Sequence, residues 1–270
     1  MNENNKHYSV LDFEAKILYA LQEAGFDLEY PLSPLELAAL DHFHTGGLVS
    51  SLALKELAKI QAEDRVLDIG AGLAGPARML AASPGCRVDC IELSPDFCSG
   101  AALLNRLTGL EELIEVIEGS VLESPFSDDT FDVAWMQNVG MNIEDKRKLY
   151  TEIHRVLKRG GRFAFQEMTA GEEEPTYFPL PWTKDSNGHF LVTAEEMESM
   201  LIECGFIVEY FEDVSDSQFT PPTSGSQNST NQTQLSLSVY VDDLATKGKN
   251  AQRSLLEEQI CFYRGVFRAI

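Results

Sequence analysis

Residues 66–75, which read VLDIGAGLAG, decide the fold of this chain. A short apolar run leads into a turn that contains Gly70, Gly72 and Gly75, and Pro76 then opens a helical pattern. Glycine permits left-handed backbone angles and lets a ligand approach the backbone where a β-carbon would block it. The stretch therefore predicts a strand, a tight glycine turn and a helix, with a ligand bound at the turn.

Two acidic residues flank this turn in the sequence. Glu92 closes the next apolar run, twenty-two residues after Gly70, and a carboxylate at that position can accept hydrogen bonds from both hydroxyls of a ribose. Asp68 lies two residues before Gly70, where its charge suits a ligand that carries an ammonium group. Together these residues predict a nucleoside site.

The glycine spacing also matches the fingerprint of dinucleotide-binding proteins, so an NAD-dependent oxidoreductase is an alternative. Two features weigh against it. About sixty residues of helical pattern precede the glycine strand, whereas dinucleotide domains usually begin with that strand. In addition, the carboxylate of Asp68 is badly placed for an anionic pyrophosphate.

Apolar runs and helical patterns alternate along the chain after residue 64. The helical patterns lie at 74–82, 95–107 and 144–157, and the last is expected to end at a glycine cap, Gly160-Gly161. Parallel strands need crossover connections, so this alternation predicts an α/β fold with a doubly wound, mostly parallel sheet. The expected strands are 65–69, 87–91, 113–117, 131–136, 162–166 and 206–211, with a seventh at 235–241.

The sequence divides into four segments. Residues 1–60 predict a helical cap that belongs to the same domain, and a capping box at Ser33 to Glu36 marks one of its helices. Residues 61–214 form the ligand-binding core, with a lid loop at 172–190. A flexible polar loop is expected at 215–234. Residues 235–270 are expected to hold the last strand followed by a C-terminal helix at 251–269.

Composition excludes several classes of function. The chain has 21 basic and 43 acidic residues and a net charge of −22, which disfavours nucleic acid and anionic membranes as partners. No apolar run approaches the roughly 20 residues of a membrane helix, and the first residues do not resemble a signal peptide. The 5 cysteines show no C-x-x-C pair, so no metal site is expected. These features predict a cytoplasmic protein with a small-molecule substrate and leave the oligomeric state open.

Five ordered segments resemble the motifs of class I S-adenosylmethionine-dependent methyltransferases. They are residues 66–72, 90–94, 119–126, 131–138 and 157–162. The cap segment 41–47 and residues 178–182 resemble the small-molecule branch, which includes sarcosine/dimethylglycine N-methyltransferases and quinone-pathway methyltransferases. The resemblance implies a seven-stranded Rossmann-like sheet and S-adenosyl-L-methionine as the cofactor.

The same resemblance assigns cofactor contacts residue by residue. Asp68 and the backbone of the glycine turn would face the methionyl part, Glu92 would hold the ribose, and Leu93, Ser120 and Val121 would lie at the adenine. Ser120 stands where many members carry an acidic residue, and serine accepts the hydrogen bond without a charge. The expected cofactor-binding residues are Asp68, Gly70, Ala71, Gly72, Glu92, Leu93, Ser120, Val121 and Gln137.

Methyl transfer from a sulfonium needs alignment and desolvation more than a fixed catalytic triad, and a base only when the acceptor must lose a proton. His44, at a helix end beside two glycines, is the first candidate. His42 is two residues away and is expected to face solvent on the opposite side of the helix. Gln137 and Asn138 follow the fourth strand, and Glu167 ends the fifth, where it is a candidate holder of a cationic acceptor. The expected catalytic residues are His44, Gln137 and Glu167.

The sequence mildly favours an amine acceptor. Tyr177, Phe178 and Trp182 are candidates for an aromatic lid, and aromatic faces attract amines that carry a positive charge. The net charge of −22 would steer cations toward the protein. Methylation of nitrogen, oxygen or carbon is left open, and a catalytically silent cofactor-binding module is a third alternative.

Overall fold

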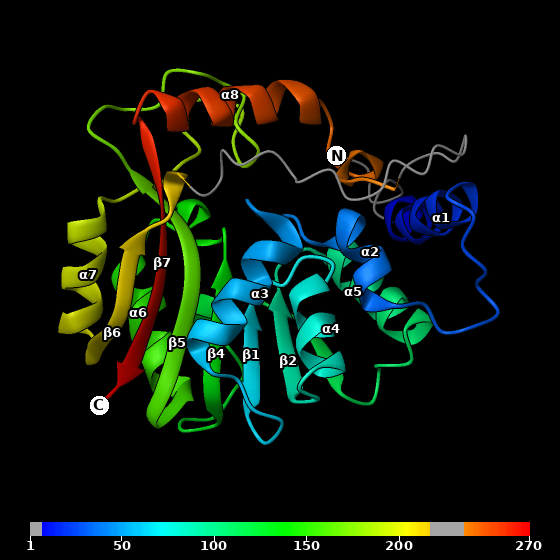
Figure 1. Ribbon diagram of the computed structural model, residues 1–270, viewed down its shortest axis with the longest axis horizontal. Helices are drawn as coiled ribbons and strands as arrows, with labels where there is room; N and C mark the ends of the chain where they lie inside the picture. The colour runs from blue at the N-terminus through cyan, green and yellow to red at the C-terminus, as the bar shows by residue number, and fades with distance from the viewer. Residues whose placement is uncertain (1–6, 217–234) are drawn as a thin grey trace.

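A computed structural model describes residues 7–216 and 235–270, so most of the predicted polar loop at 215–234 lies outside the described residues. One seven-stranded sheet with the order β3-β2-β1-β4-β5-β7-β6 forms the centre of the molecule (Figure 1). All pairs are parallel except those of β7, which runs antiparallel to both β5 and β6. The strands are β1 Arg65–Ile69, β2 Arg87–Glu92, β3 Ile114–Glu118, β4 Phe131–Gln137, β5 Leu157–Ala170, β6 Phe206–Asp213 and β7 Ile260–Ala269. The predicted α/β fold with a mostly parallel seven-stranded sheet is confirmed.

Helices cover both faces of the sheet. Helices α3 and α4 pack on one face, whereas α6 and α7 pack on the other (Figure 1). The α-helices are α1 His7–Glu23, α2 Pro34–Asp41, α3 Gly47–Ala58, α4 Gly75–Ala82, α5 Pro95–Leu107, α6 Lys146–Val156, α7 Ala194–Glu203 and α8 Leu244–Leu256. Buried apolar side chains of the strands and helices form one cluster on each face, which explains the near-continuous apolar runs of β1, β2 and β4.

The order of the last strand and helix is the reverse of the prediction. The structure has a short 3-10 turn at Leu237–Val239, then α8, and ends with β7, so both the strand expected at 235–241 and the helix expected at 251–269 are wrong. Strand β7 lies between two other strands and buries side chains on both faces. Its apolar residues therefore do not alternate, and their spacing imitates that of a helix.

The glycine pair after α6 does not cap the helix, contrary to the prediction. Helix α6 ends at Val156, and Gly160-Gly161 lie inside β5, where the pairing with β4 is irregular between Phe131 and Val133. Gly160 has a φ of +81°, a conformation that glycine adopts readily. The glycines therefore shape a bulge in a strand and not the end of a helix.

The carboxyl ends of β1, β2 and β4 lie together at one edge of the sheet, where α/β proteins bind their ligands. Helix α8 crosses above one end of this edge, and α1 and α2 lie at the opposite end (Figure 1). Within the described ranges, no helix is both long and apolar enough to cross a membrane. The same residues contain no group of three or more His, Cys, Asp or Glu side chains that could hold a metal ion.

Candidate active site

A cavity of about 730 Å³ opens at the carboxyl ends of β1, β2 and β4. Every residue expected to bind the cofactor lines it: Asp68, Gly70, Ala71, Gly72, Glu92, Leu93, Ser120, Val121 and Gln137. These residues come from four strand ends that are separated in the sequence, and the sheet order brings them to one place. The cavity falls in the size range of small-molecule and cofactor sites.

Two glycines of the turn are required by close contacts. A β-carbon on Gly70, whose φ is +62°, would lie 2.6 Å from Cγ2 of Val139. A β-carbon on Gly75 would lie 2.5 Å from the carbonyl oxygen of Asp41 and 2.7 Å from Nδ1 of His42. Gly70 therefore allows the turn itself, whereas Gly75 allows the end of α2 to press against α4 beside the cavity.

Glu92 is held in place by the backbone on both sides. Its Oε2 accepts a hydrogen bond from the amide of Gly72 at 2.9 Å, and its Oε1 accepts from the amide of Ser94 at 2.8 Å. A carboxylate oxygen accepts two hydrogen bonds, so each still has a lone pair for a ligand. The carboxylate is thus preoriented for a vicinal diol such as that of a ribose.

Asp68 is 3% exposed, and its Oδ2 has no hydrogen-bond partner among the described residues. Burial, reinforced by the negative charge of Glu92, raises the pKa of Asp68 to about 8. A buried carboxylate oxygen without a partner is costly, and a cationic ligand group would satisfy it. The arrangement of Asp68 and Glu92 therefore fits the ammonium and the ribose of S-adenosylmethionine.

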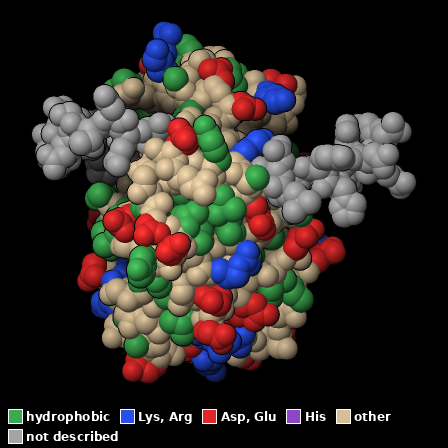
Figure 2. All heavy atoms as spheres, turned by 90° about the vertical axis from the view of Figure 1, so that its right-hand side faces the viewer, with side chains coloured by type: hydrophobic (Ala, Val, Ile, Leu, Met, Phe, Trp, Pro, Cys, Tyr) green, Lys and Arg blue, Asp and Glu red, His purple; other side chains and the backbone are tan. Residues whose placement is uncertain are grey.

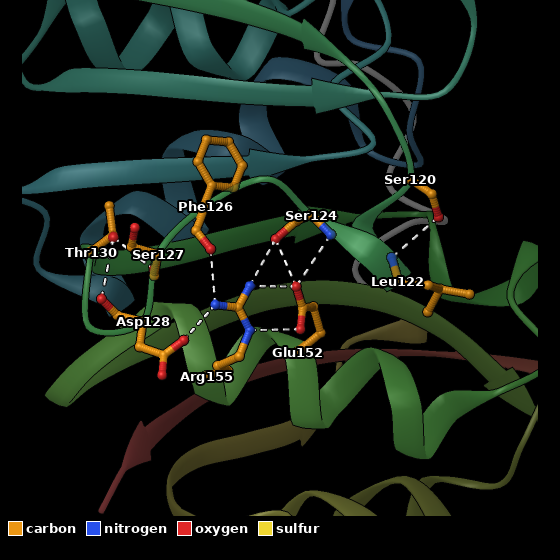
Figure 3. Close-up of polar contacts among 9 residues, drawn as sticks. All are labelled: Ser120, Leu122, Ser124, Phe126, Ser127, Asp128, Thr130, Glu152 and Arg155. Atoms are coloured by element: carbon orange, nitrogen blue, oxygen red, sulfur yellow. Dashed lines mark hydrogen bonds and ion pairs between the residues drawn. The ribbon is translucent and has the colours of Figure 1, made fainter.

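The adenine end of the cavity is formed by β2 and by the segment after β3. Leu93 lines the cavity with 71% of its surface exposed, which leaves an apolar face uncovered. Ser120 accepts a hydrogen bond at its Oγ from the amide of Leu122 at 3.2 Å, so it caps the short 3-10 turn Val121–Glu123 (Figure 3). The hydroxyl hydrogen of Ser120 is still free to donate.

Arg155 of α6 holds the loop that follows Ser120 (Figure 3). Its guanidinium donates to the carbonyl oxygen of Phe126 at 2.9 Å and pairs with Glu152 at 2.6 Å. Glu152 in turn accepts from the hydroxyl of Ser124 at 2.8 Å. These contacts tie the adenine side of the cavity to α6, which shares one apolar cluster with Val121 and Phe126.

A second cavity, of about 450 Å³, lies between residues 43–45, residues 181–182 and α8. We call it the acceptor chamber. It shares Phe43, His44, Asn138 and Asn142 with the first cavity, so the two meet at these residues.

The predicted aromatic lid is only partly formed. Trp182 lines the acceptor chamber, but Tyr177 and Phe178 do not. The hydroxyl of Tyr177 donates to Glu257 at 2.6 Å, and the guanidinium of Arg253 lies 3.9 Å from the centre of its ring. A cation of the protein therefore already occupies the face of Tyr177, and the three residues do not form an aromatic cage for an amine.

His44 and Gln137 are 93 residues apart in sequence but lie side by side at the cofactor cavity, with 3.5 Å between Nδ1 and Nε2, and His44 also lines the acceptor chamber. Gln137 Oε1 accepts a hydrogen bond from the indole of Trp135 at 3.0 Å and from the hydroxyl of Ser51 at 3.0 Å. The Oγ of Ser51 also lies 3.0 Å from His44 Nε2. Four side chains from the cap and from β4 thus form one polar network.

This network determines the tautomer of His44. An indole N–H can only donate, so the Gln137 atom that faces Trp135 is the oxygen. Ser51 must then donate to that oxygen, and it can accept only from Nε2–H of His44. The lone pair of His44 therefore lies on Nδ1, although the carbonyl of Thr45, 3.3 Å from Nδ1, would favour the other tautomer. Burial lowers the pKa of His44 to about 3, so the ring is neutral at physiological pH.

Asn138 was not among the expected catalytic residues, yet it lines both cavities. Its Nδ2 donates to Thr45 Oγ1 at 3.3 Å, and its Oδ1 is buried without a partner among the described residues. Its φ of +55° places it in the left-handed turn that follows β4, and asparagine tolerates this conformation. The sequence did contain a signal for this role, because an asparagine follows the predicted fourth strand.

Glu167 is not brought together with His44 and Gln137. It is 1% exposed and lines neither cavity. Its two oxygens accept from the amides of Val139 and Gly140, both at 2.9 Å, and burial raises its pKa to about 7. The expected contact with the acceptor fails because β5 continues to Ala170, which leaves Glu167 inside the strand and not at its end.

The prediction that His42 faces solvent is wrong. His42 is 4% exposed, and its Nδ1 lies 2.7 Å from Oδ1 of Asp41. Helix α2 ends at Asp41, and the backbone of His42, at φ −101° and ψ 72°, is no longer helical. The side chain therefore does not follow the helix face from which its direction was inferred.

Comparisons with known proteins agree with this geometry. Residues 67–165 match the family model described as a methyltransferase domain. A sarcosine/dimethylglycine N-methyltransferase of Halorhodospira halochloris is 31% identical over 148 residues, which are 55% of this chain and 53% of that protein. The chain covers still less of two other curated relatives, 20% and 37%. The resemblance to S-adenosylmethionine-dependent methyltransferases of small molecules is confirmed.

Solved structures extend the likeness in fold to nearly the whole chain. A putative sarcosine dimethylglycine methyltransferase of Galdieria sulphuraria matches 95% of this chain and 98% of its own, with a TM-score of 0.65 and 19% identity. Phosphoethanolamine N-methyltransferase 2 of Haemonchus contortus, in complex with S-adenosyl-L-methionine, matches 85% of this chain and 54% of its own, with a TM-score of 0.65 and 22% identity.

Proposed function

Because residues 67–165 carry a methyltransferase domain, we propose that this chain transfers a methyl group from S-adenosyl-L-methionine to a small-molecule acceptor. The observation that carries the proposal is the placement of Asp68 and Glu92 on either side of the glycine turn in one cavity. Asp68 would hold the ammonium group, and Glu92 the ribose hydroxyls. Leu93 and Val121 would enclose the adenine.

When bound, the cofactor supplies an electrophilic methyl group, whose bond to sulfur breaks as its bond to the acceptor forms. The protein has to align the acceptor and exclude water. His44 and Asn138 stand where the two cavities meet, and each presents an acceptor atom there. The Nδ1 of His44 lies 3.5 Å from Nε2 of Gln137, and the Oδ1 of Asn138 has no partner among the described residues. With a pKa of about 3, His44 orients an acceptor N–H or O–H rather than removing its proton before transfer.

Two observations bear on the chemistry of the acceptor. The relatives named above as sarcosine/dimethylglycine methyltransferases support an amine acceptor. Acidic side chains are prominent on the surface in Figure 2, in keeping with a net charge of −22 that would attract cations. Oxygen or carbon methylation is the alternative. We further place the protein in the cytoplasm, with a small molecule and no nucleic acid or membrane as its partner.

Isothermal titration calorimetry with S-adenosylhomocysteine tests the proposal. The wild-type chain should bind it, and Asp68→Ala and Glu92→Ala should weaken binding. NADH serves as the control ligand, since binding of NADH in place of S-adenosylhomocysteine would favour the oxidoreductase alternative. A screen of amines, phenols and quinones with isotopically labelled methyl donor then identifies the acceptor. Cofactor binding without turnover of any acceptor would favour the silent module.

A further inference from the structure

The acceptor chamber has a polar end and an apolar end. The residues it shares with the cofactor cavity, together with Thr45, supply uncharged polar groups at the point where the two cavities meet. The rest of the described lining is apolar except for Gln252 and the indole N–H of Trp182, which is buried without a partner among the described residues. The apolar side chains are Met141, Met168, Pro181, Leu237, Leu244, Ala251 and Leu255, together with the ring carbons of Trp182.

No charged side chain lines the acceptor chamber among the residues that the structure describes. The cofactor cavity differs sharply, because its lining includes Asp41, Asp68, Glu92, Glu144 and Asp145. An ammonium or carboxylate group that entered the chamber would lose hydration and find no opposite charge. Such a transfer is strongly unfavourable for a charged group, so the bound form of an amine would be the free base.

We propose that the acceptor chamber selects an uncharged molecule with one polar nucleophile at the end of an apolar body. The inference rests on the proposed function and names the class of acceptor. The nucleophile lies against His44 and Asn138 at the polar end, and the apolar body extends below α8. In the transfer, the bond from nucleophile to methyl carbon forms, the carbon–sulfur bond breaks, and a proton that the nucleophile carried is released to solvent. A small zwitterion such as dimethylglycine does not fit this chamber.

Helix α8 provides a position for a direct test. Leu244, Gly248, Ala251, Gln252 and Leu255 line the chamber, and their spacing places them on one face of the helix. A β-carbon on Gly248 would have no heavy atom within 4 Å, so a larger side chain can start there without a clash. The exposed Thr246 lies on the other side of the same helix and does not line the chamber.

The experiment compares Gly248→Phe with Thr246→Phe, which adds the same ring outside the chamber. The probe is 2-naphthol, an uncharged bicyclic molecule with a single hydroxyl, and dimethylglycine is the zwitterionic comparison. Binding is measured by calorimetry on the full chain, with and without S-adenosylhomocysteine. Thermal unfolding followed by circular dichroism shows whether each variant is folded.

We expect 2-naphthol to bind to the wild-type chain and to Thr246→Phe, and Gly248→Phe to weaken binding by about tenfold or more because the ring occupies the chamber. S-adenosylhomocysteine should bind equally to all three. The proposal is overturned if 2-naphthol fails to bind, if both variants bind it equally, or if dimethylglycine binds and Gly248→Phe abolishes that binding. Failure to bind S-adenosylhomocysteine, with the 2-naphthol results intact, would instead count against the proposed function.

Discussion

Arg78 of α4 and Asp41 at the end of α2 form an ion pair of 2.8 Å between Nη2 and Oδ2, and neither side chain is exposed to solvent. Arg78 also donates to Oδ1 of Asn105 at 2.7 Å and to the carbonyl oxygen of Leu73. Asp41 lines the cofactor cavity, and α4 begins at the glycine turn. The pair therefore fixes the cap relative to the residues that would hold the cofactor.

Loss of this pair should be strongly destabilising. Arg78→Met leaves the Asp41 carboxylate buried without its partner, and we expect the free energy of unfolding to fall by about 3 to 5 kcal/mol. Urea denaturation measures the change. The control is Arg253→Met, which removes an exposed pair with Glu257 and should leave the free energy of unfolding nearly unchanged. Equal losses in the two variants would contradict the assigned role of the pair.

Glu92 should matter for cofactor affinity through its charge. Glu92→Gln keeps the size of the side chain but weakens its hydrogen bonds to a ribose, so the Kd for S-adenosylhomocysteine should rise about 10- to 100-fold. Calorimetry measures the change. Glu118 pairs with Glu92 in the sheet register but does not line the cavity, so Glu118→Gln should leave the Kd unchanged. A similar effect of both substitutions would show that general surface charge is responsible.

The affinity for the cofactor should depend on pH through Asp68. Its pKa is raised to about 8 in the free protein, so near neutral pH it is mostly protonated. A bound ammonium group favours the ionised form, and binding therefore releases a proton. We expect the affinity for S-adenosylhomocysteine to increase as the pH rises from about 6 toward 8 and then to level off. Titrations at several pH values test this, and an unchanged slope in Asp68→Asn would exclude Asp68 as the origin.

His44 should make the protein sensitive to acid. Its pKa is about 3 when folded and near 6.5 when unfolded, so between these values the unfolded chain binds a proton that the folded one does not. The contribution of the neutral His44 ring to the free energy of unfolding is fully present above about pH 6.5 and is lost as the pH falls below that value. Between about pH 7 and pH 5, the wild type should lose about 1 to 2 kcal/mol relative to His44→Gln, reduced because the ring partly faces the cavity. If the unfolding free energies of the wild type and of His44→Gln, measured by urea denaturation, change with pH in the same way, the prediction is wrong.

Glu167 should contribute to stability and not to cofactor affinity. In Glu167→Gln one acceptor atom is lost, so an amide of the turn at Val139 or Gly140 is left unpaired in the interior. We expect the unfolding free energy to fall by about 1 to 3 kcal/mol and the Kd for S-adenosylhomocysteine to stay the same. Denaturation and calorimetry measure the two quantities, with the exposed Glu172→Gln as the control. A normal stability combined with a higher KM for the acceptor would restore Glu167 as an acceptor contact.

Prediction from sequence worked best within the first strand–turn–helix unit. Asp68 and Glu92 belong to neighbouring strands and Gly70 directly follows the first of them, and the crossover rule for parallel sheets brings such strand ends together. Their placement in one cavity therefore followed from local spacing. The role of Gly75 could not be predicted from local spacing, because the atoms that its β-carbon would contact belong to Asp41 and His42 in the cap.

By itself, the sequence determined the alternating strands and helices, the glycine turn and its acidic neighbours, since backbone conformation and burial period depend on residues close together in the chain. Only the tertiary structure decided that His44 meets Gln137 and that Glu167 turns to the backbone. It also decided that β7 follows α8 and that α8 lines the acceptor chamber. Each of these depends on which faces pack together, and that choice is made by the summed burial of distant segments, which no local pattern encodes.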